Sequence, residues 1–352
     1  MPGRERCSEC DVAGADLIEK MTRRHFVQAA GAGVAALALP RGLRADESAA
    51  NVKDSESLVK KLYESLSEKQ REEVCFNWDY TDDRKVLRTH VSNNWQITNL
   101  KSCGLHTSFF TADQKDMIEA LFWGLYNKDW HDRIRKQLQD DAKGYGKEQT
   151  IALFGKPGGE KFEFVMTGRH LTIRCDGNTT EHVAFGGPIF YGHAASGFTE
   201  KVGHPSNVFW PQAVKANELF KMLDGKQREA ALFEKMPSES AVAFRGKEKI
   251  AGLPASELSK DQREHLQGVL NLLVEPYRVS DQQEVTKCLE AQGGLDQVRL
   301  SFYREADLGN DGIWDNWRLE GPSFVWHFRG TPHVHVWVNV ADDPSVATNA
   351  HG

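Results

Sequence analysis

The chain has 352 residues, of which 40% are hydrophobic and 27% charged, a composition typical of a globular protein. Its formal net charge is −6, and lysine and arginine are spread along the chain, which argues against a nucleic-acid-binding protein. This length is sufficient for one large domain with an ample hydrophobic core.

Residues 1–45 are predicted to be an export signal. A Thr-Arg-Arg-x-Phe motif at 22–26 precedes an alanine- and glycine-rich apolar stretch that ends at Leu39, and this arrangement resembles a twin-arginine leader. The stretch is too short to span ~30 Å of hydrocarbon, and Ala45 supplies the small residue needed for cleavage. We therefore expect a bacterial, periplasmic or secreted protein that uses the export machinery and has no stable membrane anchor. The alternative is a surface arginine pair before a core helix.

The mature chain opens with helical patterns. Leucines recur every four residues within 57–74, which predicts one helix. A second helix is predicted over 111–129, where Thr111 is the N-cap and Gln114 has the capping-box spacing. A further amphipathic stretch continues to about residue 139.

The pattern changes between about 150 and 187 to short β-type runs that are separated by glycine and proline turns. These runs are IALFG, KFEFVMTG, HLTIRCDG and HVAFGG. A second set of such runs lies between 298 and 340, where NDG is predicted to be the turn of a hairpin. The chain thus reads as an α+β protein.

The two sets of elements resemble each other. LDGKQREAALFEKM (223–236) echoes LSEKQREEVCFNWD (66–79), and SKDQREHLQGVLNLL echoes TADQKDMIEALFWGL. We expect two internally duplicated α+β halves, 46–205 and 206–352, each with helices followed by antiparallel strands. Both halves are predicted to pack as one globule, a single domain over 46–352. Chance similarity of polar helix ends is the alternative.

The repeat makes a local prediction about two histidines. Phe164-x-x-x-Gly168 matches Trp326-x-x-x-Gly330, and a one-residue insertion then places His170 opposite His333. The two halves would present these histidines at the start of equivalent strands.

Several runs resemble a mainly bacterial family known as domain of unknown function 3500. They are the SEKQRE helix start, FGKPGGEKFEFVMTGRHLTIRCDGN, FGGPIFYGH and WDNWRLEGPSFVWHFRGTPHVHVWVNV. The resemblance covers essentially the whole mature chain, and it supports the domain boundaries. It implies no chemistry, because no activity is established for the family.

The PHVHV segment is the main candidate site. His333 and His335 leave the same face of a strand, and two such imidazoles can reach one ion at the ~2.0–2.1 Å typical of zinc. His170 is the preferred third ligand because of the repeat, and His193 and His204 follow as loop histidines close to glycine. The sequence therefore predicts a transition-metal site, for zinc or copper, built from His170, His193, His333 and His335. The alternative is a histidine pair that hydrogen-bonds to backbone or carboxylates without a metal.

Two further residues are predicted to take part in catalysis. Glu320 could act as general base on a metal-bound water or orient a histidine. Arg329 could hold an anionic substrate group or pair with Glu320. The predicted function is an exported metal-dependent hydrolase or oxidoreductase. The alternative is a non-enzymatic periplasmic or cell-surface protein that binds a ligand or has a structural role.

The mature chain has four widely separated cysteines. They are Cys75, Cys103, Cys175 and Cys288. Export would permit disulfides between them, and buried free thiols are the alternative.

Overall fold

The computed structural model describes residues 55, 57–159, 161–176, 182–195, 207–246, 250–309 and 312–350. The predicted export signal and His204 lie outside these ranges. Within them, every helix is too short or too polar to cross a bilayer.

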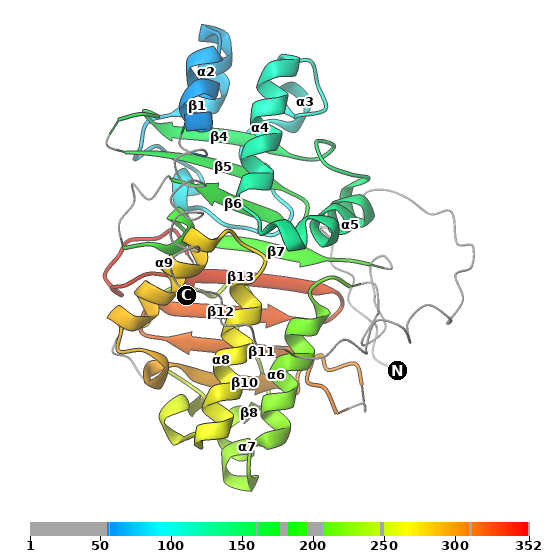
Figure 1. Ribbon diagram of the computed structural model, residues 1–352, viewed down its shortest axis with the longest axis vertical. Helices are drawn as coiled ribbons and strands as arrows, with labels where there is room; N and C mark the ends of the chain where they lie inside the picture. The colour runs from blue at the N-terminus through cyan, green and yellow to red at the C-terminus, as the bar shows by residue number, and fades with distance from the viewer. Residues whose placement is uncertain are drawn as a thin grey trace, which may run out of the picture.

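One eleven-stranded mixed sheet forms the centre of the molecule (Figure 1). Strands β2 and β3 pair in a separate two-stranded sheet. The strand order is β1-β4-β5-β6-β7-β13-β12-β11-β10-β8, and β9 pairs with β10. The strands are β1 (Cys75–Phe76), β2 (Thr81–Asp82), β3 (Lys85–Val86), β4 (Thr150–Gly155), β5 (Phe162–Gly168), β6 (Leu171–Cys175), β7 (Ile189–His193), β8 (Leu232–Phe233), β9 (Leu253–Pro254), β10 (Arg299–Tyr303), β11 (Asn316–Gly321), β12 (Phe324–Arg329) and β13 (Val334–Val340). The predicted α+β class is confirmed.

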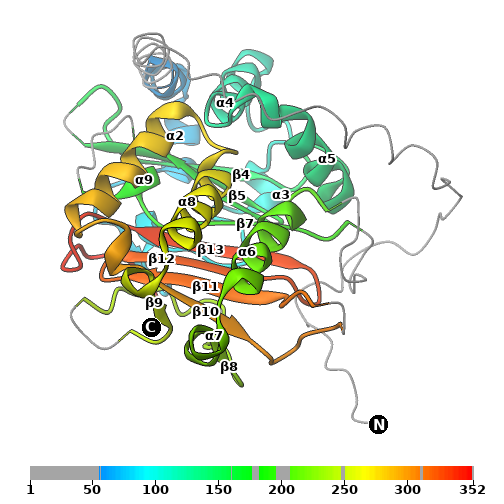
Figure 2. The ribbon, with the colours of Figure 1, turned by 60° about the horizontal axis from the view of Figure 1, so that its bottom comes forward.

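Helices cover one face of this sheet, as Figures 1 and 2 show for α4, α5, α6, α8 and α9. The α-helices are α2 (Glu68–Val74), α3 (Leu100–Cys103), α4 (Ala112–Gly124), α5 (His131–Ala142), α6 (Trp210–Met222), α7 (Gly225–Ala231), α8 (Lys260–Val274) and α9 (Val279–Ala291). Connecting segments pack on the opposite face, where Val91 and Val242 contact Trp337 in a smaller apolar cluster. We call these the helix face and the loop face.

Strand β13 shows how the sequence divides between the two faces. Val334, Val336 and Val338 belong to the main core on the helix face, whereas Trp337 belongs to the cluster on the loop face. Alternate side chains of a strand point to opposite faces, so His335 shares the loop face with Trp337.

The predicted helix over 57–74 is two helices. The first ends at residue 65, and Ser67 then caps α2 by accepting a hydrogen bond from the Gln70 N–H, while the Gln70 side chain accepts one from Ser67 N. This capping box stops the first helix and starts the second. The predicted Thr111–Gln114 capping box is confirmed at the start of α4.

The HVAFGG run was predicted to be a strand and is not one. Phe185 and Gly186 have φ values of 62° and 77°, in the left-handed region that an extended strand does not use. The run forms a short 3-10 turn, Ala184–Gly186, and the strand follows at β7. The predicted antiparallel pairing of β10 and β11 is confirmed. The connection between them is longer than a tight turn, since β10 ends at Tyr303 and β11 begins at Asn316, and residues 310–311 of the predicted NDG turn lie outside the described residues.

Two groups of strands have the same pairing pattern and meet where β7 pairs with β13. In one group β1 is parallel to β4, and β4, β5, β6 and β7 pair antiparallel. In the other, β8 is parallel to β10, and β10, β11, β12 and β13 pair antiparallel. By this order β5 corresponds to β11. The match of Phe164–Gly168 with Trp326–Gly330, on β12, therefore does not follow the sheet, and His170 is not equivalent to His333.

The four cysteines of the described chain are free thiols. Cys103, Cys175 and Cys288 are buried, and Cys75 is partly buried. This agrees with the second of the two alternatives that the sequence left open.

Candidate metal centre

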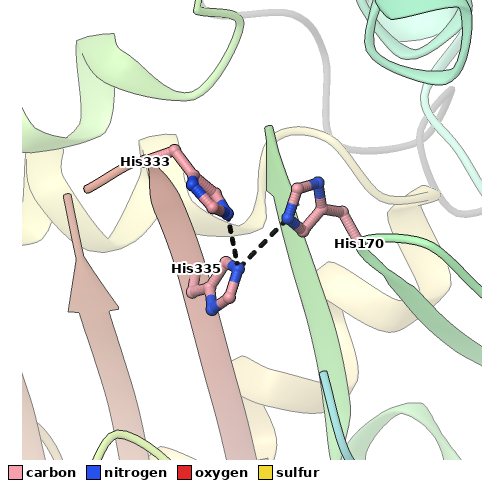
Figure 3. Close-up of side chains that lie close together, drawn as sticks. All are labelled: His170, His333 and His335. Atoms are coloured by element: carbon pink, nitrogen blue, oxygen red, sulfur yellow. Dashed lines mark hydrogen bonds between the residues drawn. The ribbon is translucent and has the colours of Figure 1, made fainter. Parts of the chain in front are cut away.

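Three buried histidines meet at one end of the sheet (Figure 3). His170 lies in the turn between β5 and β6, His333 directly precedes β13, and His335 lies on β13. The Nε2 atom of His335 is 3.1 Å from Nε2 of His170 and 3.0 Å from Nε2 of His333. One ligand atom from each residue lies within 4.8 Å of the others, and each residue is 1% or less exposed.

Strand register brings these residues together. On β13, His335 lies opposite Gly192 of β7, and a Cβ atom on Gly192 would collide with Val334 O and lie 3.2 Å from Cδ2 of His170. Glycine therefore lets the His170 ring approach β13. His170 itself has a φ of 50°, and its N–H donates to Asn94 Oδ1 over 3.0 Å, which holds the turn in this conformation.

Carboxylates orient two of the three rings. Asp141 Oδ2, at the end of α5, lies 2.9 Å from Nδ1 of His170. Glu239 Oε2, from the loop face, lies 3.1 Å from Nδ1 of His335. An ionised carboxylate only accepts hydrogen bonds, so Nδ1 of His335 carries the proton, and the charge of Asp141 favours a proton on Nδ1 of His170. In the neutral tautomer Nε2 then has a lone pair, which is the arrangement seen in metal-ligating histidines.

The charge states of these groups follow from their surroundings. Burial alone would raise the pKa of Asp141, but His170, His193 and the Ala194 N–H lower it to about 2. Burial, followed by the charge of Arg329, lowers the pKa of His335 well below its usual value. Asp141 is therefore an anion, and His335 is neutral, near pH 7.

If the rings of His170 and His335 are both neutral and protonated at Nδ1, their Nε2 lone pairs face each other, and a cation between them would stabilise this arrangement. The Nε2 atoms of His170 and His335 are at hydrogen-bond distance, yet neither holds a proton when both rings are neutral and donate through Nδ1. A positive ion between them removes the repulsion. Tetrahedral bonds of ~2.0–2.1 Å place ligand nitrogens about 3.4 Å apart, so the two short Nε2 separations need only small shifts. The three histidines could hold a metal ion.

His193 lies beside the centre, but its ring has other partners. Its Nδ1 accepts a hydrogen bond from Val208 N over 3.1 Å, and its Nε2 lies 3.0 Å from Asp140 Oδ2. Both nitrogens are therefore engaged, and the group of possible ligands comprises the other three histidines. His193 is placed to support the end of α5.

The two residues predicted to act in catalysis lie in different places. Arg329 is close to the centre: it donates from Nη2 to His333 O over 3.3 Å and from Nη1 to Glu239 Oε1 over 3.1 Å. Glu320 lies on β11 and pairs with Arg318 and Arg245. Arg329 thus forms an ion pair with Glu239, and Glu320 forms ion pairs with two other arginines.

Sequence reasoning missed the two carboxylates. Asp141 follows Asp140 at the end of an amphipathic helix, and Glu239 lies in a polar connection. Acidic residues at such positions are common on protein surfaces. The only local signal was the burial of Asp141 on the core side of α5, together with Ile134 and Leu138.

The comparisons with known proteins agree with the sequence resemblance. A family model described as "Protein of unknown function (DUF3500)" matches residues 48–349. No curated protein and no solved structure matches the chain. The chemistry of the site is therefore the basis for assigning a function.

Proposed function

The chain belongs to the DUF3500 family, whose description assigns no activity, and we propose that it binds one transition-metal ion through His170, His333 and His335. The observation that carries this proposal is the meeting of three buried Nε2 atoms, two of them on rings whose Nδ1 faces a carboxylate. Zinc and copper are the proposed metals, because both accept imidazole ligands.

A metal ion with three protein ligands keeps an open position, which is typical of catalytic zinc sites. Water bound there is a nucleophile near neutral pH if the ion is zinc. Copper with the same ligands would support electron transfer instead. The proposed activity is therefore that of a metal-dependent hydrolase or oxidoreductase.

The second candidate is a non-enzymatic role, in ligand binding or in structure. The near-complete burial of all three rings supports it, since a buried ion that links β13 to the β5–β6 turn would stabilise the fold. Turnover of a substrate by the loaded protein separates the two candidates.

We propose in addition that the protein is exported through the twin-arginine route to the periplasm or beyond the cell. The sequence motif at 22–26 supports this. Export in the folded state would allow the metal to be inserted before translocation. The proposal is tested by replacing both arginines with lysine and following the location of the mature chain in its host.

We infer, finally, an internal duplication of one α+β unit. The shared pairing pattern of the two strand groups supports it, as do four capping boxes built on Gln70, Gln114, Gln227 and Gln262. Gln70 donates to Gln114 over 2.8 Å, and Gln227 donates to Gln262 over 3.1 Å. The proposed metal centre uses residues of both units, and the described residues contain no second group of histidines like it.

Metal analysis of protein folded in its native host tests the main proposal. We expect about one equivalent of a transition metal per chain, and less than about a tenth of an equivalent after His333→Ala or His170→Ala. His182→Ala, whose side chain is 59% exposed, is the matched control and should keep the metal. Metal-free wild-type protein whose thermal stability does not change on chelation would overturn the proposal.

A further inference from the structure

We propose that the centre acts on an anion, a carboxylate or a phosphate, whose oxygens bind both the metal ion and the guanidinium of Arg169. This inference rests on the proposed function, because it needs the ion in place. It names the class of ligand that the centre takes and the residue that selects it.

Arg169 is positioned by the same turn that positions the first ligand. It directly precedes His170 between β5 and β6. Its Nε atom is buried and has no hydrogen-bond partner, and no ion pair of the described residues includes it. A buried polar atom without a partner costs free energy, and a ligand oxygen would supply the missing acceptor.

Arg169 is partly buried, and the fully buried arginines differ from it in their ion pairs. Each of them has a carboxylate partner within the described chain: Arg88 and Arg174 pair with Glu163, Arg278 with Asp281, Arg318 with Glu320, and Arg329 with Glu239. Each buried guanidinium thus faces a carboxylate. Arg169, which is partly buried and next to His170 in the sequence, has no such partner among the described residues.

The charges around the centre favour the same ligand. Arg169 directly precedes the first ligand, His170, in the β5–β6 turn, so its positive charge lies close to the proposed ion. The carboxylates of Asp141 and Glu239 are balanced by the guanidiniums of Arg169 and Arg329. A divalent ion therefore adds positive charge that nothing in this group of residues neutralises, and it attracts an anion.

The guanidinium also suits an oxyanion in shape. Its planar set of N–H donors matches the paired oxygens of a carboxylate or phosphate. One oxygen could then occupy the open position on the metal while others accept hydrogen bonds from Arg169. A neutral ligand of the same size would lack this second contact.

The test uses the full chain loaded with cobalt(II), whose visible absorption reports ligands at the metal. Metal content is measured first, and inorganic phosphate, acetate and neutral acetamide are then titrated separately. We expect wild type to bind phosphate or acetate, but not acetamide. Arg169→Gln should keep its metal and bind that anion about tenfold or more weakly, and Arg169→Lys should recover part of the affinity. Arg135→Gln, whose side chain is 56% exposed, is the control and should match wild type.

Three results would overturn the inference while leaving the proposed function standing. The first is an unchanged anion affinity in Arg169→Gln. The second is a metal-loaded wild type whose absorption responds to neither anion. The third is loss of metal from Arg169→Gln, which would give Arg169 a structural role. A wild type that takes up no metal would instead refute the proposed function itself. A response to acetate alone or phosphate alone identifies the ligand group.

Discussion

Asp141→Asn is expected to weaken metal binding although it removes no ligand. In the structure, Oδ2 of Asp141 faces Nδ1 of His170 at 2.9 Å, and Oδ1 accepts the Ala194 N–H over 3.0 Å. An asparagine that keeps the bond to Ala194 presents its NH₂ group to His170. The same group faces Gln137, whose side-chain amide donates to Asp141 Oδ2 over 2.9 Å and must turn its oxygen toward the asparagine. Nδ1 must then accept a hydrogen bond, so the ring proton moves to Nε2, the atom that faces His335, and this nitrogen can no longer bind an ion.

Loss of such a carboxylate partner typically lowers metal affinity by about 10- to 100-fold, which is about 1.4 to 2.7 kcal/mol. The effect is complete at pH 7, because the pKa of Asp141 is about 2. In the metal-free protein this pKa lies below the 3.8 of the free side chain. The contacts of the Asp141 carboxylate with His170, His193 and the Ala194 N–H therefore add stability that is present above pH 3.8 and is lost as the pH falls toward 2.

The dissociation constant is measured by competition with a chromophoric chelator at pH 7, and ¹⁵N spectra of the imidazoles report the tautomer of His170. Asp132→Asn is the control, since this residue lies on the same helix with its side chain 98% exposed. A wild-type dissociation constant for Asp141→Asn, or an unchanged tautomer, would refute the reasoning.

Three further predictions concern Gly192, Glu284 and the effect of the bound ion on stability. Gly192→Ala should lose metal and about 1–3 kcal/mol of stability, because its Cβ collides with Val334 O and crowds the His170 ring; wild-type metal content and melting temperature would contradict this. Burial, and then the charge of Asp176, raise the pKa of Glu284 to about 9. Between about pH 4.5 and 9 the folded state therefore retains a proton that the unfolded state loses. The free energy of unfolding should fall as the pH rises through this range, by at most about 1.4 kcal/mol per pH unit. Urea unfolding should show a smaller decrease in the free energy of unfolding from pH 5 to pH 8 for Glu284→Gln than for wild type. Equal decreases would contradict the raised pKa of Glu284. Metal at a hundred times its dissociation constant should stabilise wild type by about 2.7 kcal/mol and leave His333→Ala unchanged in a thermal melt.

The sequence predicted those elements that are fixed by residues close to one another in the chain. The Thr111–Gln114 capping box fixes the start of α4 because both partners lie within one helical turn. The alternation in HVHVWVNV likewise placed the valines of β13 on one face and His335 on the other. The same local chemistry was overlooked at Ser67, where a capping box divides the predicted helix.

The complete site could not be predicted, because its parts come together through tertiary structure. The repeat alignment predicts His170 as a ligand, but the strand order does not follow that alignment. His170 reaches His335 because the β5–β6 turn packs over Gly192. Asp141 comes from α5 and Glu239 from a connection on the loop face. Apart from the helical spacing of Asp141 with Ile134 and Leu138, nothing in the local sequence distinguishes these two residues from surface acids. Strand β7 was not predicted, because the glycines at 186 and 187 shortly before it are typical of a turn and obscure the start of the strand.

X-ray absorption of the loaded protein tests the central claim most directly. Three imidazole nitrogens at ~2.0–2.1 Å from one zinc ion per chain are predicted, and this shell should lose an imidazole in His170→Ala. A shell without imidazole, or one that is the same in wild type and His170→Ala, would contradict the three-histidine centre.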